Sequence, residues 1–310
     1  MDRRLIVTID TEVDKDRRWQ VSTPVTFESV VTGVPGLLSP LFDEYGVVPT
    51  YLLSPEVMED SDCADVMRAL GDRAELGTHL HGEFISPERR LDRSNMAGAL
   101  ADTAQCQYGK ELEAAKLASL TELFRATFGR RPTSFRAGRY GLGPDTFSSL
   151  ASLGYKVDSS VTPGLVWRYP QATLDYRSWG TDPIWIETPS GPLLEAPVGI
   201  RAGGPVAPIV DEAPRWVARG LRGILGDRAR HLWLRPSWVD GPGLIRYVKG
   251  TSSRTLVLMF HSIEITPGAS PYAADTSDVA RIVASLRGLF EHCIATGIGF
   301  CGLTDIVADA

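Results

Sequence analysis

Short, largely apolar runs alternate with longer amphipathic stretches along most of the 310-residue chain. Apolar runs of a few residues are typical of strands in a parallel sheet that is covered on both faces. Eight runs are predicted to be strands: residues 5–9, 47–53, 75–81, 134–137, 155–159, 193–198, 256–260 and 298–303.

The intervening stretches carry apolar residues three or four positions apart, which is the spacing of one helix face. They predict helices at residues 35–45, 64–70, 96–128 (with a break near Gly109) and 144–153. The last helix is the clearest, because its apolar positions 279, 282, 283, 286, 290 and 293 lie between a capping Asp275 and a closing Gly297.

Strands that alternate with helices predict a parallel α/β fold. Seven or eight strands in a single domain over residues 1–310 favour a distorted (β/α) barrel, with a doubly wound open sheet as the alternative. The pattern becomes irregular at residues 160–192 and 199–250, which are rich in Pro, Gly, Trp and Arg. We interpret these two segments as insertions over one face of the barrel.

Composition and charge narrow the possible partners. The chain is 43% hydrophobic and 23% charged, as in ordinary globular proteins, and its formal net charge of −6 argues against non-specific binding of nucleic acid. No stretch reaches the roughly 18 apolar residues of a membrane-spanning helix. The N-terminus runs directly into a predicted strand without a signal-peptide pattern, so a cytoplasmic location is expected.

Reactive side chains fall at the carboxyl ends of the predicted strands. Asp10, His79, His81, Arg136 and His261 each end or directly follow one of these runs. In a (β/α) barrel the carboxyl ends of the strands meet at one mouth, where active sites form. The sequence therefore predicts that these side chains share one site.

Two pairs with a spacing of two predict a metal site. His79 and His81 point to the same side of an extended strand, and Asp10 and Glu12 have the same spacing. Two histidines with one carboxylate leave open positions on a catalytic zinc, with cobalt or nickel as further candidates. Such an ion lowers the pKa of a bound water and polarises a carbonyl, and the second carboxylate is free to act as general base.

Three further residue types complete a hydrolytic site. His261 is the candidate acid that protonates the leaving amine. Arg136 is the candidate partner that keeps the base carboxylate ionised and oriented. Arg139 and Tyr140 follow in the same segment, FRAGRY, and are candidate substrate-binding residues at the rim.

These segments resemble, in the same order, the motifs of the NodB-like polysaccharide deacetylases, from residue 5 to about residue 303. The family motif T-F-D-D-G resembles residues 8–12 (TIDTE), and E-I-G-x-H-(S/T)-x-x-H resembles residues 75–81 (ELGTHLH). The motif R-x-P-x-G resembles residues 136–141 (RAGRYG), and the strand end Leu-x-His resembles residues 258–261 (LMFH). The resemblance implies a distorted (β/α) barrel, a divalent metal and removal of acetyl groups from N-acetylated sugars.

The resemblance also implies a role for each matched residue. It makes Asp10 the base, His79 a metal ligand, Arg136 the partner of the base and His261 the acid. The fourth family motif is not recognisable here, so Asp158 or Glu195 is the expected partner that tunes His261.

The chain departs from the family pattern at the metal ligands. Because Thr11 replaces the second Asp of the first motif, the metal carboxylate is expected at Glu12, with Asp14 as an alternative. The second histidine comes at His81, and Glu83 occupies the position where the family has it, which makes Glu83 a third candidate carboxylate.

The predicted activity is removal of an acetyl or related acyl group from a small or sugar-linked amine, such as a nucleotide- or lipid-linked amino sugar or a natural-product intermediate. Alternatives are hydrolysis of another C–N amide bond, a non-haem iron oxygenase, a metal-free glycosidase that uses Glu187 and Glu195, and a degenerate barrel that binds sugars without turnover. Tryptophans in the insertions are candidate stacking surfaces for a substrate ring: Trp167, Trp179, Trp185, Trp233 and Trp238.

Overall fold

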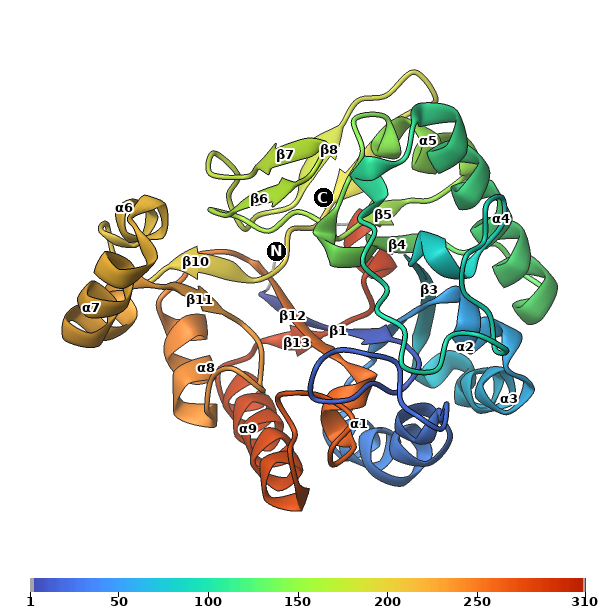
Figure 1. The fold of residues 1–310 in the computed structure, drawn as a ribbon. Coiled ribbons are helices and arrows are strands. Elements are labelled where there is room, and N and C mark those ends of the chain that lie inside the picture. Colours follow the sequence, from blue (N-terminus) through green and yellow to red (C-terminus); the bar gives the residue numbers. More distant parts are fainter. Residues whose placement is uncertain (1–2, 309) are drawn as a thin grey trace.

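A curled sheet forms the centre of the computed structural model, which describes residues 3–308 and 310 (Figure 1). In the described residues its strand order is β12-β1-β2-β3-β4-β5-β9-β8, and β13 pairs with the other edge of β1. The strands are β1 (Arg4–Thr11), β2 (Thr50–Leu53), β3 (Glu75–Leu80), β4 (Ser134–Ala137), β5 (Val157–Asp158), β8 (Ile184–Ile186), β9 (Leu193–Glu195), β12 (Thr255–His261) and β13 (Gly299–Phe300).

The strand order decides between the two predicted architectures. Neighbouring strands from β1 to β5 follow the chain, β12 returns beside β1, and all pairs are parallel except β8 with β9. A doubly wound sheet would reverse direction at a switch point, so that alternative is wrong and the distorted barrel is confirmed. All eight predicted strands lie in this sheet.

The barrel is closed by irregular backbone rather than by a regular strand pair. The Gly199 amide donates to the Val257 carbonyl at 2.8 Å, and the Leu234 amide donates to the Gly199 carbonyl at 2.7 Å. The Met259 amide then donates to the Leu234 carbonyl at 3.2 Å. These bonds join the end of the β9 segment to β12 and account for the distortion.

The predicted helices pack around this sheet (Figure 1). The helix predicted at 35–45 begins earlier, because a π-helical stretch (Ser29–Leu38) runs into α1 (Ser39–Tyr45) and contains Pro35. At the start of α9 (Thr276–Ala295), Asp275 accepts hydrogen bonds from the Ser277 and Asp278 amides, so the predicted cap is confirmed. The remaining helices of this layer are α2 (Pro55–Glu59), α3 (Ser61–Leu70), α4 (Lys110–Phe128) and α5 (Thr146–Leu153).

The long helix predicted at 96–128 is wrong in its first part. Only α4 forms, and Gly109 is its N-cap. Residues 96–104 instead lie along the loop that follows β1, where the Val21 amide donates to the Ala99 carbonyl at 2.8 Å and the Gly98 amide donates to the Val21 carbonyl at 2.9 Å. Met96, Ala101 and Ala104 are buried in this segment although it forms no helix.

The two irregular segments contain more regular structure than the sequence indicates. Residues 160–192 carry the hairpin β6 (Val166–Tyr169) and β7 (Ala172–Asp175) together with β8. Residues 199–250 carry β10 (Ile200–Ala202), α6 (Ala207–Glu212), α7 (Arg215–Leu225), β11 (His231–Trp233) and α8 (Gly241–Lys249). The pair α6 and α7 projects from the side of the molecule (Figure 1).

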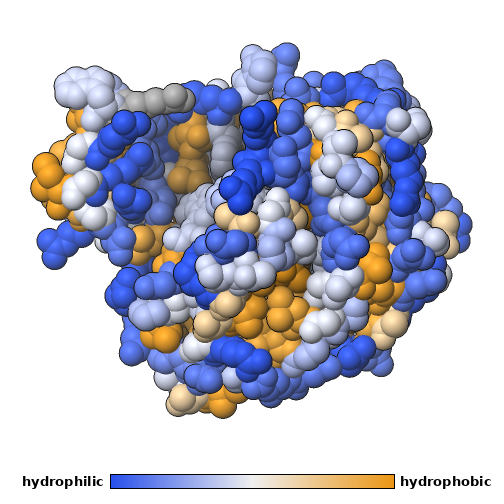
Figure 2. All heavy atoms as spheres, turned by 60° about the horizontal axis from the view of Figure 1, so that its bottom comes forward, coloured by the Kyte–Doolittle hydropathy of each residue, from blue (hydrophilic) through white to orange (hydrophobic). Residues whose placement is uncertain are grey.

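The surface is mixed in character. Figure 2 shows a face on which hydrophilic residues surround smaller hydrophobic areas. In the part of the chain that the structure describes, no helix combines the length and apolar character that crossing a membrane requires.

Candidate active site

Strand register brings the predicted residues to one mouth of the barrel. Asp10 near the end of β1 is the register partner of His261 at the end of β12. In the same way, His79 near the end of β3 is the partner of Arg136 in β4. Glu12 directly follows β1. The structure therefore brings these strand ends together at one mouth of the barrel.

Glu12, His79 and His81 form a compact buried group. Oε1 of Glu12 lies 3.2 Å from Nε2 of His79 and 3.1 Å from Nε2 of His81. One ligand atom from each residue lies within 4.8 Å of the others, and all three residues are buried. Two imidazoles and a carboxylate are the ligand set of many catalytic zinc sites.

The donor chemistry of this group fits a cation. Nδ1 of His79 lies 3.0 Å from the Arg136 carbonyl, which can only accept, so we assign the ring proton to Nδ1. The lone pair of Nε2 then faces the Glu12 carboxylate, which is also an acceptor. A cation between Nε2 of His79 and the Glu12 carboxylate would bind both of these acceptors. A backbone carbonyl that accepts from the other ring nitrogen, here Nδ1, is a usual partner of a metal-bound histidine.

The environment of Glu12 keeps it ionised. Burial alone would raise the pKa of Glu12, but the Lys15 ammonium and the two histidines hold it well below its usual range. Lys15 forms a buried ion pair with the second oxygen, Oε2, and its ammonium lies 5.2 Å from the centre of the Trp19 ring.

The other two candidate carboxylates point elsewhere. Asp14 accepts hydrogen bonds from the Thr26 hydroxyl at 2.8 Å and from the Glu28 amide at 2.6 Å, so it orders the loop after β1. Glu83 accepts from the Thr103 amide at 2.6 Å. Glu12 is therefore the candidate carboxylate that contacts both histidines.

Asp10 and Arg136 form a buried pair beside the metal-binding group. Nη1 of Arg136 donates to Oδ1 of Asp10 at 2.6 Å, and both side chains are almost fully buried. The guanidinium also donates to the Ser159 carbonyl and to the Thr8 hydroxyl. Burial alone would raise the pKa of Asp10, but Arg136, His79 and His261 together outweigh this effect and lower the pKa. Asp10 is thus an oriented carboxylate that stays ionised.

His261 is oriented by Glu264, and not by Asp158 or Glu195 as the sequence led us to expect. Nδ1 of His261 lies 3.0 Å from Oε1 of Glu264 and 3.1 Å from Nη2 of Arg235. Because the carboxylate can only accept and Arg235 already donates to it, we assign the ring proton to Nδ1. Nε2 then lies 3.9 Å from Oε1 of Glu12 and 4.0 Å from Oδ2 of Asp10. Glu264 is buried, and it forms an ion pair with Arg235. Burial would raise the pKa of Glu264, but Arg235 and His261 lower it to about 2.

Asp158 and Glu195 lie together in the interior, on the paired strands β5 and β9. Asp158 accepts from the Ser160 hydroxyl at 2.6 Å, and Glu195 accepts from the Val161 amide at 3.0 Å. Burial raises the pKa of both carboxyl groups, and neither lines the pocket described below. Their contacts give them a structural role.

The turn after β4 has an unusual backbone. Arg139 and Tyr140 both have φ of 56°, in the left-handed region that non-glycine residues rarely adopt. Gly138 precedes them, and a Cβ there would collide with the Leu80 carbonyl and touch the His81 ring. The Tyr169 hydroxyl donates to the Arg139 carbonyl and fixes the turn. Strained backbone of this kind gathers at ligand sites.

A pocket of about 530 Å³ opens above the metal-binding group. It contains all the predicted catalytic and metal residues except Arg136, which lies behind Asp10, and it also contains Arg139 and Tyr140. Trp167, Trp233 and Trp238 line it as predicted, whereas Trp179 and Trp185 are not among its lining residues. The size is that of a site for a small molecule.

Sequence reasoning missed several residues of this pocket and its support. Glu264 stands three residues after His261, in HSIE, and that local signal was available. Lys15 and Trp19 come from the loop after β1, and Arg235 and Tyr272 from other irregular segments, where no periodicity marks them. Arg235 lies between two rings, with its guanidinium 4.6 Å from Trp238 and 4.8 Å from Tyr272.

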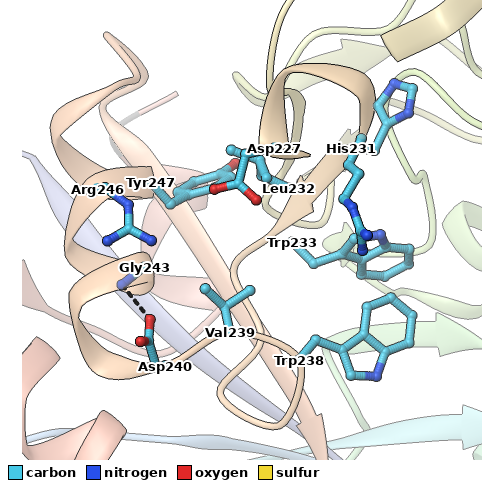
Figure 3. Close-up of a pocket in the computed structure, with 11 residues that line it drawn as sticks. Asp227, His231, Leu232, Trp233, Trp238, Val239, Asp240, Gly243, Arg246 and Tyr247 are labelled. Atoms are coloured by element: carbon cyan, nitrogen blue, oxygen red, sulfur yellow. Dashed lines mark hydrogen bonds between the residues drawn. The ribbon is translucent and has the colours of Figure 1, made fainter. Parts of the chain in front are cut away.

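A second pocket of about 550 Å³ lies between α8 and β11. Figure 3 shows Trp233 and Trp238 on one side of it and Arg246 and Tyr247 of α8 on the other. Because the two tryptophans also line the first pocket, they separate one pocket from the other.

Comparison with known proteins supports the fold. No protein-family model matches the chain, and no curated protein matches it in sequence. Among solved structures, a probable polysaccharide deacetylase from Pseudomonas aeruginosa PAO1 has a TM-score of 0.54 at 15% identity, over 98% of this chain and 89% of that one. A Puue allantoinase has a TM-score of 0.53 at 13% identity, over 98% and 88%.

The same fold also occurs in a GH57-type branching enzyme from Pyrococcus horikoshii, with a TM-score of 0.56 at 12% identity, over 100% of this chain and 70% of that one. The predicted resemblance to polysaccharide deacetylases is therefore confirmed for the architecture. Because proteins with different names share it, the reaction has to be argued from the site.

Proposed function

We propose that this protein is a metal-dependent hydrolase that removes an acetyl or related acyl group from the nitrogen of a small amine, such as an amino sugar. One observation carries the proposal. The buried Glu12–His79–His81 group lies directly beside an ionised carboxylate, Asp10, and an oriented imidazole, His261. This is a metal-ligand set with a base and an acid within reach.

Glu12, His79 and His81 would hold the divalent ion, and zinc, cobalt or nickel suits these ligands. When bound, such an ion supplies Lewis acidity that polarises the amide carbonyl and acidifies a water molecule. The remaining chemistry belongs to the chain's own side chains.

Asp10 accepts a proton from the attacking water, whose oxygen forms the new bond to the carbonyl carbon. Arg136 keeps Asp10 ionised and fixes its Oδ1, so Oδ2 is free for this proton. His261 donates a proton from Nε2 to the nitrogen as the C–N bond breaks. The products are a carboxylate and an amine, and Glu264 stabilises the protonated imidazole before transfer.

Two alternatives receive less support from the geometry. An iron oxygenase would use the Glu12–His79–His81 group but leaves the Asp10–Arg136 and His261–Glu264 pairs without a role. The glycosidase hypothesis needs Glu187 and Glu195 in one pocket, yet Glu187 is exposed, Glu195 is buried, and neither lines the pocket beside Asp10.

Acetate release from a panel of N-acetylated amines and amino sugars tests the proposal. The protein is stripped with a chelator and reloaded separately with zinc, cobalt or nickel. We expect activity only after reloading, and a loss of about 100- to 10,000-fold in kcat for His261→Ala. His292→Ala removes a histidine on α9, away from the site, and should retain full activity. Equal activity in stripped and reloaded protein would contradict the proposal.

A further inference from the structure

The pocket beside the metal-binding group has a continuous wall of aromatic rings. Trp19 contacts Tyr272 at a centroid distance of 5.5 Å, and Tyr272 contacts Trp238 at 5.7 Å. Trp238 contacts Trp233 at 4.8 Å. The series continues through Tyr140 to Trp167, with centroid distances of 5.9 and 5.8 Å. We call these six side chains the aromatic wall.

The aromatic wall is built before any ligand arrives. Each ring rests on its neighbour, and Trp19 also packs edge-on against His261 at 5.2 Å. Of the four non-glycine residues with positive φ in the described residues, three line this pocket: Trp19, Arg139 and Tyr140. A preformed wall of this kind fits the flat or ring-shaped body of a small molecule.

The charges that line the pocket do not cancel. Lys15 is paired with Glu12, and Arg235 is paired with Glu264. Arg18 and Arg139 line the same pocket, and among the described residues no carboxylate lies within 4.0 Å of either guanidinium. In a chain with a net charge of −6, this pocket presents two uncompensated positive groups.

Arg139 is the more informative of the two arginines. Its Nε is buried, and within the described part of the chain it has no hydrogen-bond partner. The neighbouring Tyr140 hydroxyl is also buried and likewise lacks a partner among the described residues. Buried donors without acceptors are unfavourable, so two of them at consecutive positions of a strained turn indicate that a ligand supplies the acceptor.

We propose that the turn Gly138–Arg139–Tyr140 recognises an anionic group of the substrate, and that the substrate is a compact N-acylated molecule with a ring body and a carboxylate or phosphate. Nε and one Nη of a guanidinium form a planar fork that matches two oxygens of such an anion, and the Tyr140 hydroxyl donates to a third lone pair. The aromatic wall holds the ring body, and the acyl group faces Glu12, His79 and His81. This inference rests on the proposed hydrolase function for the position of the acyl group.

Two charge-matched probe pairs test the proposal on the metal-loaded protein. One pair is N-acetylphenylalanine and its carboxamide, and the other is N-acetylglucosamine 6-phosphate and N-acetylglucosamine. Binding is followed by quenching of tryptophan fluorescence, because four tryptophans line the pocket, and turnover is followed by acetate release. The variants are Arg139→Gln and Arg139→Lys, with Arg281→Gln on the surface of α9 as control.

We expect at least one anionic probe to bind about tenfold or more tightly than its neutral partner, since a charged hydrogen-bonded contact contributes about 1.5–3 kcal/mol. In Arg139→Gln that preference should disappear, with the loss of affinity falling mainly on the anionic partner. Arg139→Lys should retain only part of it, because an ammonium lacks the fork. Arg281→Gln should behave as the wild type.

Equal binding of charged and neutral partners, a preference that persists in Arg139→Gln, or no binding of either anionic probe would overturn the proposal. Its failure is separable from that of the hydrolase function. Acetate released equally from charged and neutral probes would refute only the anion site. Binding that depends on Arg139 without acetate release from any reloaded protein would refute only the hydrolase.

Discussion

The contact between His261 and Glu264 makes the sharpest prediction about catalysis. Oε1 of Glu264 accepts from Nδ1 of His261 at 3.0 Å, from the His261 amide at 3.1 Å, and from the Arg235 guanidinium. Glu264→Gln keeps the size of the side chain but removes its charge. The imidazole would then lose the carboxylate that stabilises its protonated form.

The structure sets two magnitudes for this substitution. Breaking a buried ion pair by neutralising one partner costs about 3–5 kcal/mol of stability, because Arg235 stays buried and unpaired. Complete loss of general-acid catalysis lowers kcat by about 100- to 10,000-fold. This is the loss expected for His261→Ala, and it is the largest effect that Glu264→Gln can have through His261. We expect Glu264→Gln to lower kcat by at least about tenfold and by no more than that limit.

The double variant Arg235→Met/Glu264→Gln separates stability from catalysis. Removing both charges should recover at least half of the lost free energy of unfolding, measured by urea denaturation, because no unpaired charge remains. It should not recover kcat, since His261 still lacks its carboxylate. A folded Glu264→Gln with wild-type kcat, or a double variant that regains kcat together with stability, would refute the role assigned to Glu264.

Three further substitutions give smaller tests. Burial raises the pKa of Glu56 from 4.5 to about 7, so the folded state favours the protonated side chain and the free energy of unfolding should fall by about 3 kcal/mol as pH rises from 4.5 to 7. Urea denaturation across this range should show a smaller fall in Glu56→Gln than in the wild type. An equal fall in the two proteins would contradict the raised pKa. Gly138→Ala places a Cβ against the Leu80 carbonyl and should displace His81. The affinity for the metal ion, measured by competition with a chelator, should therefore fall. Unchanged affinity would show that the turn can shift without moving His81. Asp275→Ala removes the α9 cap and should lower the free energy of unfolding, measured by urea denaturation, by about 0.5–2 kcal/mol with no change in kcat. Unchanged stability would show that the cap contributes nothing.

The sequence predicts the barrel well because parallel strands buried on both faces are continuous apolar runs, and all eight strands found in this way pair in one sheet. The same logic misses β8, which is three residues long and half exposed. It also predicts a helix at residues 96–104, because Met96, Leu100 and Ala104 follow at intervals of four, as on a helix face. In the structure Met96 and Ala104 are buried in a loop and Leu100 is exposed.

The site is predictable to the extent that it lies on strands. Spacings of two place His79 with His81 and Asp10 near Glu12, because alternation in an extended chain is fixed. The sequence suggests Asp158 or Glu195, on other strand ends, as the partner of His261. A short 3₁₀ turn (Ser262–Ile265) instead brings the nearby Glu264 back to the ring. The aromatic wall comes largely from irregular segments, and no local sequence pattern predicts that these segments meet at one pocket.

Metal content, measured by elemental mass spectrometry on purified protein reloaded with zinc, cobalt or nickel, is the most direct test of the proposed metal site. We expect about one ion per chain in the wild type and in His292→Ala, and loss of that ion in His79→Ala, His81→Ala and Glu12→Gln, with circular dichroism showing that each variant is folded. A folded wild type that takes up no ion, or variants of these three residues that retain it, would show that Glu12, His79 and His81 do not form a metal site.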